Sequence, residues 1–157
     1  MRSVYVETTV VSYFVARPSR DVVVAARQES TRELWQHLLA DYDCCVSMLV
    51  LEEAGKGERE YASRRLSALN TFVVLEIDDS ARELAERIIQ GHGIPAEFPE
   101  DALHIAVAAV NGIDVLLTWN CAHLNNPFTR RIVRQIVENA GFECPEICSP
   151  DELLESN

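Results

Sequence analysis

The sequence predicts an α/β protein with a parallel sheet and helices on both of its faces. Short apolar runs alternate along the chain with longer segments whose apolar residues recur at helical spacing, and this alternation is typical of βαβ units. The length of 157 residues suits one domain, and an apolar content of 48% is enough to build a core. We therefore expect residues 1–157 to form a single domain.

Each element has its own local signal. Apolar, β-branched runs predict strands at 3–6, 44–47, 72–76, 114–118 and 146–148. Helical spacing, closed in several places by glycine, predicts helices at 8–15, 21–40, 49–54, 58–69, 80–90, 100–110 and 127–139. The run Ser149-Pro150-Asp151-Glu152 is a capping-box pattern with Pro at the first helical position, which predicts a final helical turn.

The net charge of −11 taken alone argues against a nucleic-acid binder, because phosphate contacts depend on Lys and Arg. Part of that charge can instead belong to a metal site, where a bound cation reverses the local sign. An acidic surface also suits a basic partner protein. The arginines form two clusters, each on one predicted helix: Arg130, Arg131 and Arg134, and Arg59, Arg64 and Arg65. Each cluster is most simply a solvated helix face, and RNA contact is left open for the first.

The cysteines and the apolar runs indicate a cytoplasmic protein. Five cysteines at spacings that fit no zinc pattern are most simply reduced, partly buried thiols. The longest apolar stretch, 102–117, is interrupted by His104, Asn111 and Asp114, so we expect no membrane span. Glu7 makes the N-terminal run a poor signal peptide.

Four polar residues, far apart in the sequence, occupy equivalent positions in the predicted fold. Glu7, Glu53 and Asn120 each follow an apolar run, and Asp101 opens an apolar helix. In a parallel sheet, strand ends and the helix starts above them share one edge, where ligands bind. Carboxylates gathered there repel one another unless a cation lies between them, and oxygen ligands favour Mg²⁺ or Mn²⁺. The pattern predicts metal-dependent chemistry on phosphate.

Neighbouring side chains refine this set. Adjacent residues on a helix point about 100° apart, so we expect Glu53 to face the site and Glu52 to be solvated. His104 lies three residues after Asp101 and on the same helix face. It can orient Asp101 or touch phosphate, or it can be a histidine at the edge of the core.

The segments YVETTVVSYF, SMLVLEE, DALHIA and LLTWNCAHL occur in the order and spacing of a known family. With them the chain resembles the PIN-domain family, and specifically VapC-type toxins of toxin–antitoxin systems. The resemblance spans nearly the whole chain. It implies a Rossmann-like α/β/α sandwich, an endoribonuclease that uses Mg²⁺ or Mn²⁺, a homodimer, and a small cognate antitoxin as partner.

The resemblance also implies roles for single residues. The metal-binding acids of the family fall at Glu7, Glu53 and Asp101, and its fourth catalytic position falls at Asn120. Glu7 departs from the pattern, because the family typically has Asp there; the fourth position is Asp or Asn in the family.

The expected reaction is metal-assisted hydrolysis of RNA phosphodiester bonds, with Thr8 and Thr118 able to hydrogen-bond water or phosphate. The alternative is a PIN-fold binding module whose site has lapsed and which acts through protein or RNA partners. A phospho-acceptor domain also uses an acidic pocket on a parallel sheet, but it needs a Lys late in the chain. It is set aside because Lys56 is the only Lys.

Overall fold

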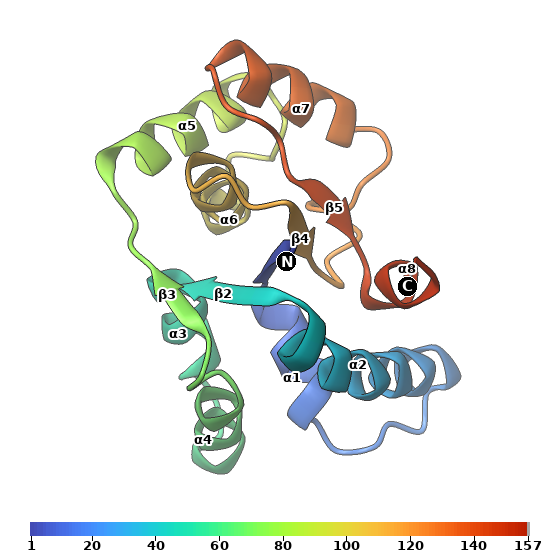
Figure 1. Ribbon diagram of the computed structural model, residues 1–157. Helices are drawn as coiled ribbons and strands as arrows, with labels where there is room; N and C mark the ends of the chain where they lie inside the picture. The colour runs from blue at the N-terminus through green and yellow to red at the C-terminus, as the bar shows by residue number, and fades with distance from the viewer. Residues whose placement is uncertain (157) are drawn as a thin grey trace.

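One parallel sheet lies at the centre of the computed structural model, which describes residues 1–156 (Figure 1). The described residues contribute five strands in the order β3-β2-β1-β4-β5, all parallel. They are β1 Ser3–Val6, β2 Asp43–Ser47, β3 Val73–Leu75, β4 Val115–Leu117 and β5 Glu146–Cys148. The predicted parallel sheet is confirmed.

The strand order puts a topological switch point beside β1. The chain runs outward from β1 through β2 to β3, then crosses back to place β4 and β5 on the other side. Val4 pairs with both Cys44 of β2 and Val115 of β4, so β1 is central. In open α/β sheets, ligands bind at the carboxyl ends of the strands where the order reverses, which here is the gap between β1 and β4.

Helices cover both faces and make the predicted α/β/α sandwich. Figure 1 shows α5, α6 and α7 on one side of the sheet and α1, α2 and α8 on the other. Two further helices, α3 and α4, pack against α1. The bounds are α1 Thr8–Val15, α2 Val22–Asp41, α3 Met48–Ala54, α4 Arg59–Ala68, α5 Asp79–Gln90, α6 Pro99–Val110, α7 Arg130–Asn139 and α8 Pro150–Glu155.

Side-chain caps explain most helix starts. Asp21 caps α2 by accepting from Val24 N, and Asp78 caps α5 by accepting from Ala81 N. The predicted capping box at Ser149 is present. The predicted start of α7 at 127 is wrong by three residues, because Asn126 Oδ1 accepts from Phe128 N and holds a turn before the helix begins.

The core is apolar and continuous through the sheet. Val4, Tyr5 and Val6 of β1 are all fully buried. Trp35 of α2 stacks against Phe14 and Phe72 at ring-centroid distances of 4.2 and 5.6 Å. The apolar stretch of α6 is core rather than a membrane span, since none of the helices in residues 1–156 combines the length and hydropathy that a bilayer crossing requires.

Close packing of α5 on α7 accounts for two glycines. A Cβ at Gly91 would lie 2.5 Å from Ile136 Cδ1, and one at Gly93 would lie 2.9 Å from Val133 Cγ2. Neither glycine has a positive φ, whereas His92 between them has φ 63°. Gly91 and Gly93 therefore matter because they lack a side chain where α7 packs closely, more than because of their backbone conformation.

The cysteines are free thiols, as predicted. Burial raises the pKa of Cys44, Cys45 and Cys148 to about 12 and that of Cys144 to about 11. Cys121 is exposed on the loop after β4.

We predict that one thiol per chain reacts rapidly with a disulfide reagent in the native state at pH 8. The thiolate is the reactive form, and the four partly buried thiols hold little of it at that pH. The measurement is the stoichiometry of the fast phase, with Cys121→Ser as the variant that removes it. A fast phase of several equivalents, or one that survives Cys121→Ser, would contradict this account.

Candidate metal centre

Glu7 stands directly after β1 and caps α1. Its carboxylate accepts from the backbone N–H of Thr9 and from the hydroxyls of Thr9 and Thr118, the last at 2.6 Å. The side chain is not solvated as a simple cap would be, because Glu7 is only 4% exposed. The centre of the sheet edge therefore holds a buried carboxylate with three hydrogen-bond donors.

Glu53 reaches the same edge from α3. One of its oxygens, Oε1, accepts from Thr8 Oγ1 at 2.6 Å and from His104 Nε2 at 2.8 Å. Glu52 is exposed, so the helix presents Glu53 to the cluster and Glu52 to solvent. The hydroxyls of Thr8 and Thr118 donate to Glu53 and Glu7 and hold these carboxylates in place; their predicted contacts with water or phosphate stay a prediction.

His104 is buried between the core and Glu53. Its Nδ1 lies 2.6 Å from the Tyr5 hydroxyl, which lies 2.8 Å from Ser47 Oγ. Because burial raises the pKa of Tyr5, that hydroxyl stays protonated. Of the alternatives for His104, the structure favours a histidine at the edge of the core, since the ring is buried and both ring nitrogens are engaged by Tyr5 and Glu53. The spacing along α6 gave the right face, but the ring extends into the core.

Asp101 belongs to a second hydrogen-bonded group. Its Oδ2 accepts from His123 Nδ1 at 3.0 Å and from Asn120 Nδ2 at 3.3 Å. The side-chain carbonyl of Asn120 accepts from His123 N at 3.0 Å. In the structure Asn120 therefore positions Asp101 and His123.

The sheet edge thus gathers the predicted residues into two adjoining groups. Ligand atoms of Glu7, Glu53 and His104 lie within 4.8 Å of one another, as a metal site requires. Asp101 lies outside that tight set. Burial lowers the pKa of His104, but the hydrogen bond to Glu53 and the nearby charges of Glu7, Glu53 and Asp101 outweigh it, so that pKa is raised. His123 and Thr9 are the partners that sequence reasoning did not assign, although both flank acidic motifs.

Negative charge at this edge has little compensation. Across residues 1–156, the side-chain nitrogens of basic residues within 4 Å of these carboxylates belong to histidines, His104 at Glu53 and His123 at Asp101, and none of the acids has an ion pair with Lys or Arg. Burial raises the pKa of Asp101 against its hydrogen bonds. For Glu53, burial is outweighed by the bonds from His104 and Thr8, and its pKa is lowered.

The donor set fits a hard divalent cation. Glu53 and Asp101 each use one oxygen for the bonds that position them, and the other accepts no hydrogen bond from the described residues. Carboxylate oxygens held in this way by neighbouring hydroxyls and imidazoles are typical of metal ligands with an ordered outer shell.

The chain was compared with known families and structures. The model of the PIN domain matches residues 4–120, which is well over half of the chain. The chain therefore belongs to the PIN-domain family. The match covers β1 to the loop after β4, including all the acids described above.

Solved structures show the same fold. A chain in the crystal structure of VapBC2 from Rickettsia felis, bound to a DNA fragment from their promoter, superposes with a TM-score of 0.60 at 13% identity. The match covers 94% of this chain and 98% of that chain. A comparison with curated proteins finds no match.

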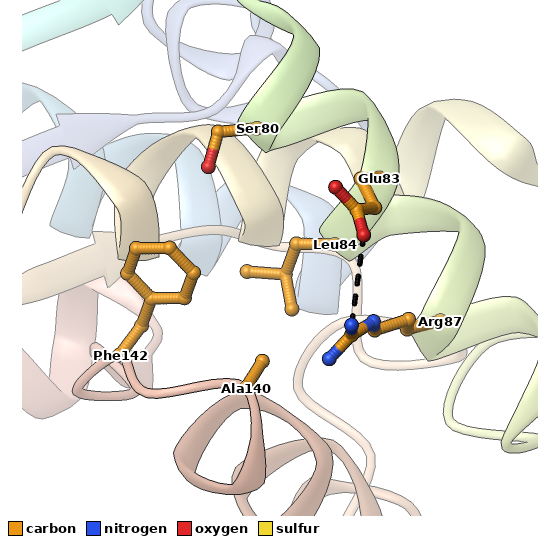
Figure 2. Close-up of a pocket in the computed structure, with 6 residues that line it drawn as sticks. All are labelled: Ser80, Glu83, Leu84, Arg87, Ala140 and Phe142. Atoms are coloured by element: carbon orange, nitrogen blue, oxygen red, sulfur yellow. Dashed lines mark ion pairs between the residues drawn. The ribbon is translucent and has the colours of Figure 1, made fainter.

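A separate hollow lies between α5 and the connection from α7 to β5. Figure 2 shows its lining residues, among them Leu84 and Phe142, with an ion pair of 3.5 Å between Glu83 and Arg87 at its rim. None of the predicted site residues lines it. The acidic edge, not this hollow, is the candidate site.

Removing the negative charge of Asp101 and removing that of Glu53 should shift the Tm of the metal-free protein in opposite directions. The raised pKa of Asp101 means that its ionised form opposes folding at neutral pH, so Asp101→Asn should raise the Tm in chelator. The lowered pKa of Glu53 means that its ionised form adds stability, which is lost as pH falls through that pKa, so Glu53→Gln should lower the Tm. The two Tm shifts should therefore have opposite signs.

The measurement is thermal unfolding at pH 7 in excess chelator, with Glu52→Gln as the matched control on α3. Equal shifts of the same sign for Asp101→Asn and Glu53→Gln would contradict the electrostatic account.

Proposed function

We propose that this protein is a metal-dependent endoribonuclease that cleaves RNA phosphodiester bonds as the toxin of a toxin–antitoxin pair. The observation that carries the proposal is the partly buried acidic cluster without Lys or Arg partners, placed at the switch point of a PIN fold. Clustered carboxylates on such an edge suit a divalent cation and, through it, phosphate.

Mg²⁺ or Mn²⁺ is the proposed cofactor, held by Glu7 and Glu53 with Asp101 alongside. A bound ion of this kind supplies activation of water and neutralisation of charge on the phosphate and the leaving oxygen. The protein's own part is positioning. Thr9 and Thr118 fix Glu7, while Thr8 and His104 fix Glu53.

Asp101 is held on the other side of the edge by Asn120 and His123. Its carboxylate can bind the ion or accept a proton from an attacking water, since one oxygen is free of hydrogen bonds from the described residues. Asn120 contributes by orientation, so an uncharged residue is sufficient at that position.

The alternative, a lapsed binding module, is less well supported. A buried carboxylate costs stability unless it is hydrogen-bonded and paired, and Glu7 has hydrogen bonds but no Lys or Arg partner among the described residues. Glu7 is one methylene longer than the usual Asp, and three donors from Thr9 and Thr118 accommodate its carboxylate.

The partners proposed are an RNA substrate, a cognate antitoxin and a second copy of the chain. The structural neighbour from Rickettsia felis is part of a VapBC complex, which supports an antitoxin here. The net charge of −11 suits a basic antitoxin segment laid over the acidic edge. A cytoplasmic location follows from this role.

Purified protein should cleave single-stranded RNA with Mg²⁺ or Mn²⁺ and should stop in excess chelator. Glu7→Gln, Glu53→Gln and Asp101→Asn should each lower kcat by at least about 100-fold, because each removes a charged oxygen ligand but preserves shape. Glu52→Gln, one residue from Glu53 but exposed, is the matched control and should keep full activity. RNA cleavage that is undiminished in excess chelator would contradict the metal-dependent mechanism.

Expression in a bacterial host should slow growth if the protein is a toxin. The Glu53→Gln variant, produced at the same level, should allow normal growth because the effect depends on RNA cleavage. Growth curves and blots of protein level make the comparison. Equal inhibition by both forms, or normal growth with soluble, RNA-cleaving protein, would count against a toxin.

A further inference from the structure

An exposed aromatic pair stands beside the third acid. The ring of Phe98 lies over the imidazole of His123, with 3.9 Å between centroids and an interplanar angle of 30°. Phe98 is 42% exposed although it is large and apolar. His123 covers one part of the ring, and the rest is open to solvent.

The backbone holds Phe98 in place without using its ring. Phe98 N donates to Pro95 O at 3.0 Å, and Phe98 O accepts from Asp101 N at 3.1 Å. Pro99 follows at the first helical position and restricts the conformation of Phe98. The ring is thus fixed on the same turn of chain that carries Asp101.

This position goes against local preference. Phe98 is the N-cap of α6, where Ser, Thr, Asp or Asn would satisfy a free N–H, and no side-chain cap is made. A helix start that gives up its cap and exposes an apolar ring is the kind of local conflict found at functional sites.

The other half of the pair is tied to the site. His123 Nδ1 bonds to Asp101, and His123 N bonds to Asn120 Oδ1. These two bonds fix the imidazole under the Phe98 ring. The imidazole that contacts Phe98 is therefore held by the same hydrogen bonds that position Asp101.

We propose that Phe98 stacks an unpaired nucleobase of the RNA next to the bond that is cleaved. This inference rests on the proposed ribonuclease function. Aromatic faces bind bases of single strands by stacking, which tolerates any sequence. Affinity of this kind suits a chain of net charge −11, since charge attraction to phosphate is weak.

The test is steady-state cleavage of a short single-stranded RNA with one mapped cleavage site, in Mn²⁺. Phe98→Ala should raise KM by about 5- to 100-fold with kcat little changed, because stacking contributes to binding before and during the reaction. Phe98→Trp keeps an aromatic face at this position, so its KM should be close to that of the unmodified protein. Phe128→Ala is the matched control, since Phe128 is 86% exposed and makes no ring contact among the described residues.

A second substrate series identifies the base. Each RNA carries one abasic ribose near the cleavage site. At one position the abasic substrate should bind equally weakly to the unmodified protein and to Phe98→Ala, because the stacking partner is already absent. Thermal unfolding checks that Phe98→Ala is folded.

The outcomes are separable. Cleavage by the unmodified protein with unchanged KM in Phe98→Ala, or equal losses in Phe98→Ala and Phe128→Ala, would overturn the stacking role alone. Additive losses at every abasic position would also overturn it. Absence of cleavage by the unmodified protein, despite Mn²⁺ binding, would overturn the proposed function and this inference with it.

Discussion

The carboxylate of Glu7 is the group around which the edge of the sheet is organised. It follows the central strand β1, between β2 and β4, and is almost fully buried. A buried charge is costly unless it is hydrogen-bonded and paired, and in residues 1–156 it has hydrogen bonds but no Lys or Arg. A divalent cation bound at this edge would supply the positive charge that no Lys or Arg of the described residues provides.

Core packing and site geometry are linked through one chain of hydrogen bonds. Ser47 ends β2, Tyr5 lies inside β1, and His104 projects from α6 to Glu53. Three elements of the fold thereby fix one carboxylate oxygen of Glu53. Because the outer partners are themselves buried, the orientation of Glu53 is set when the sheet and α6 pack.

Local patterns predicted the fold closely because each element carries its own signal. The strands have β-branched runs, and every predicted end except the start of α7 lies within one residue of the structure. That start depends on the side chain of Asn126, which competes with the helix for a backbone N–H. The parallel topology alone was enough to predict that the acids lie at one edge of the sheet. Their hydrogen-bond partners were not predictable: Thr118 meets Glu7 across 111 residues, and His104 turns from Asp101 to Glu53. Tertiary packing determines these hydrogen-bond partners, and it leaves no periodic pattern in the sequence from which they could be predicted.

The most direct test of a cation site at this edge is anomalous scattering from crystals grown with Mn²⁺. The account predicts an anomalous peak in contact with the carboxylates of Glu7 and Glu53, near Asp101, and loss of that peak in Glu53→Gln. Well-diffracting crystals soaked at millimolar Mn²⁺ with no peak between these carboxylates, or with a peak only at other acidic residues, would contradict it.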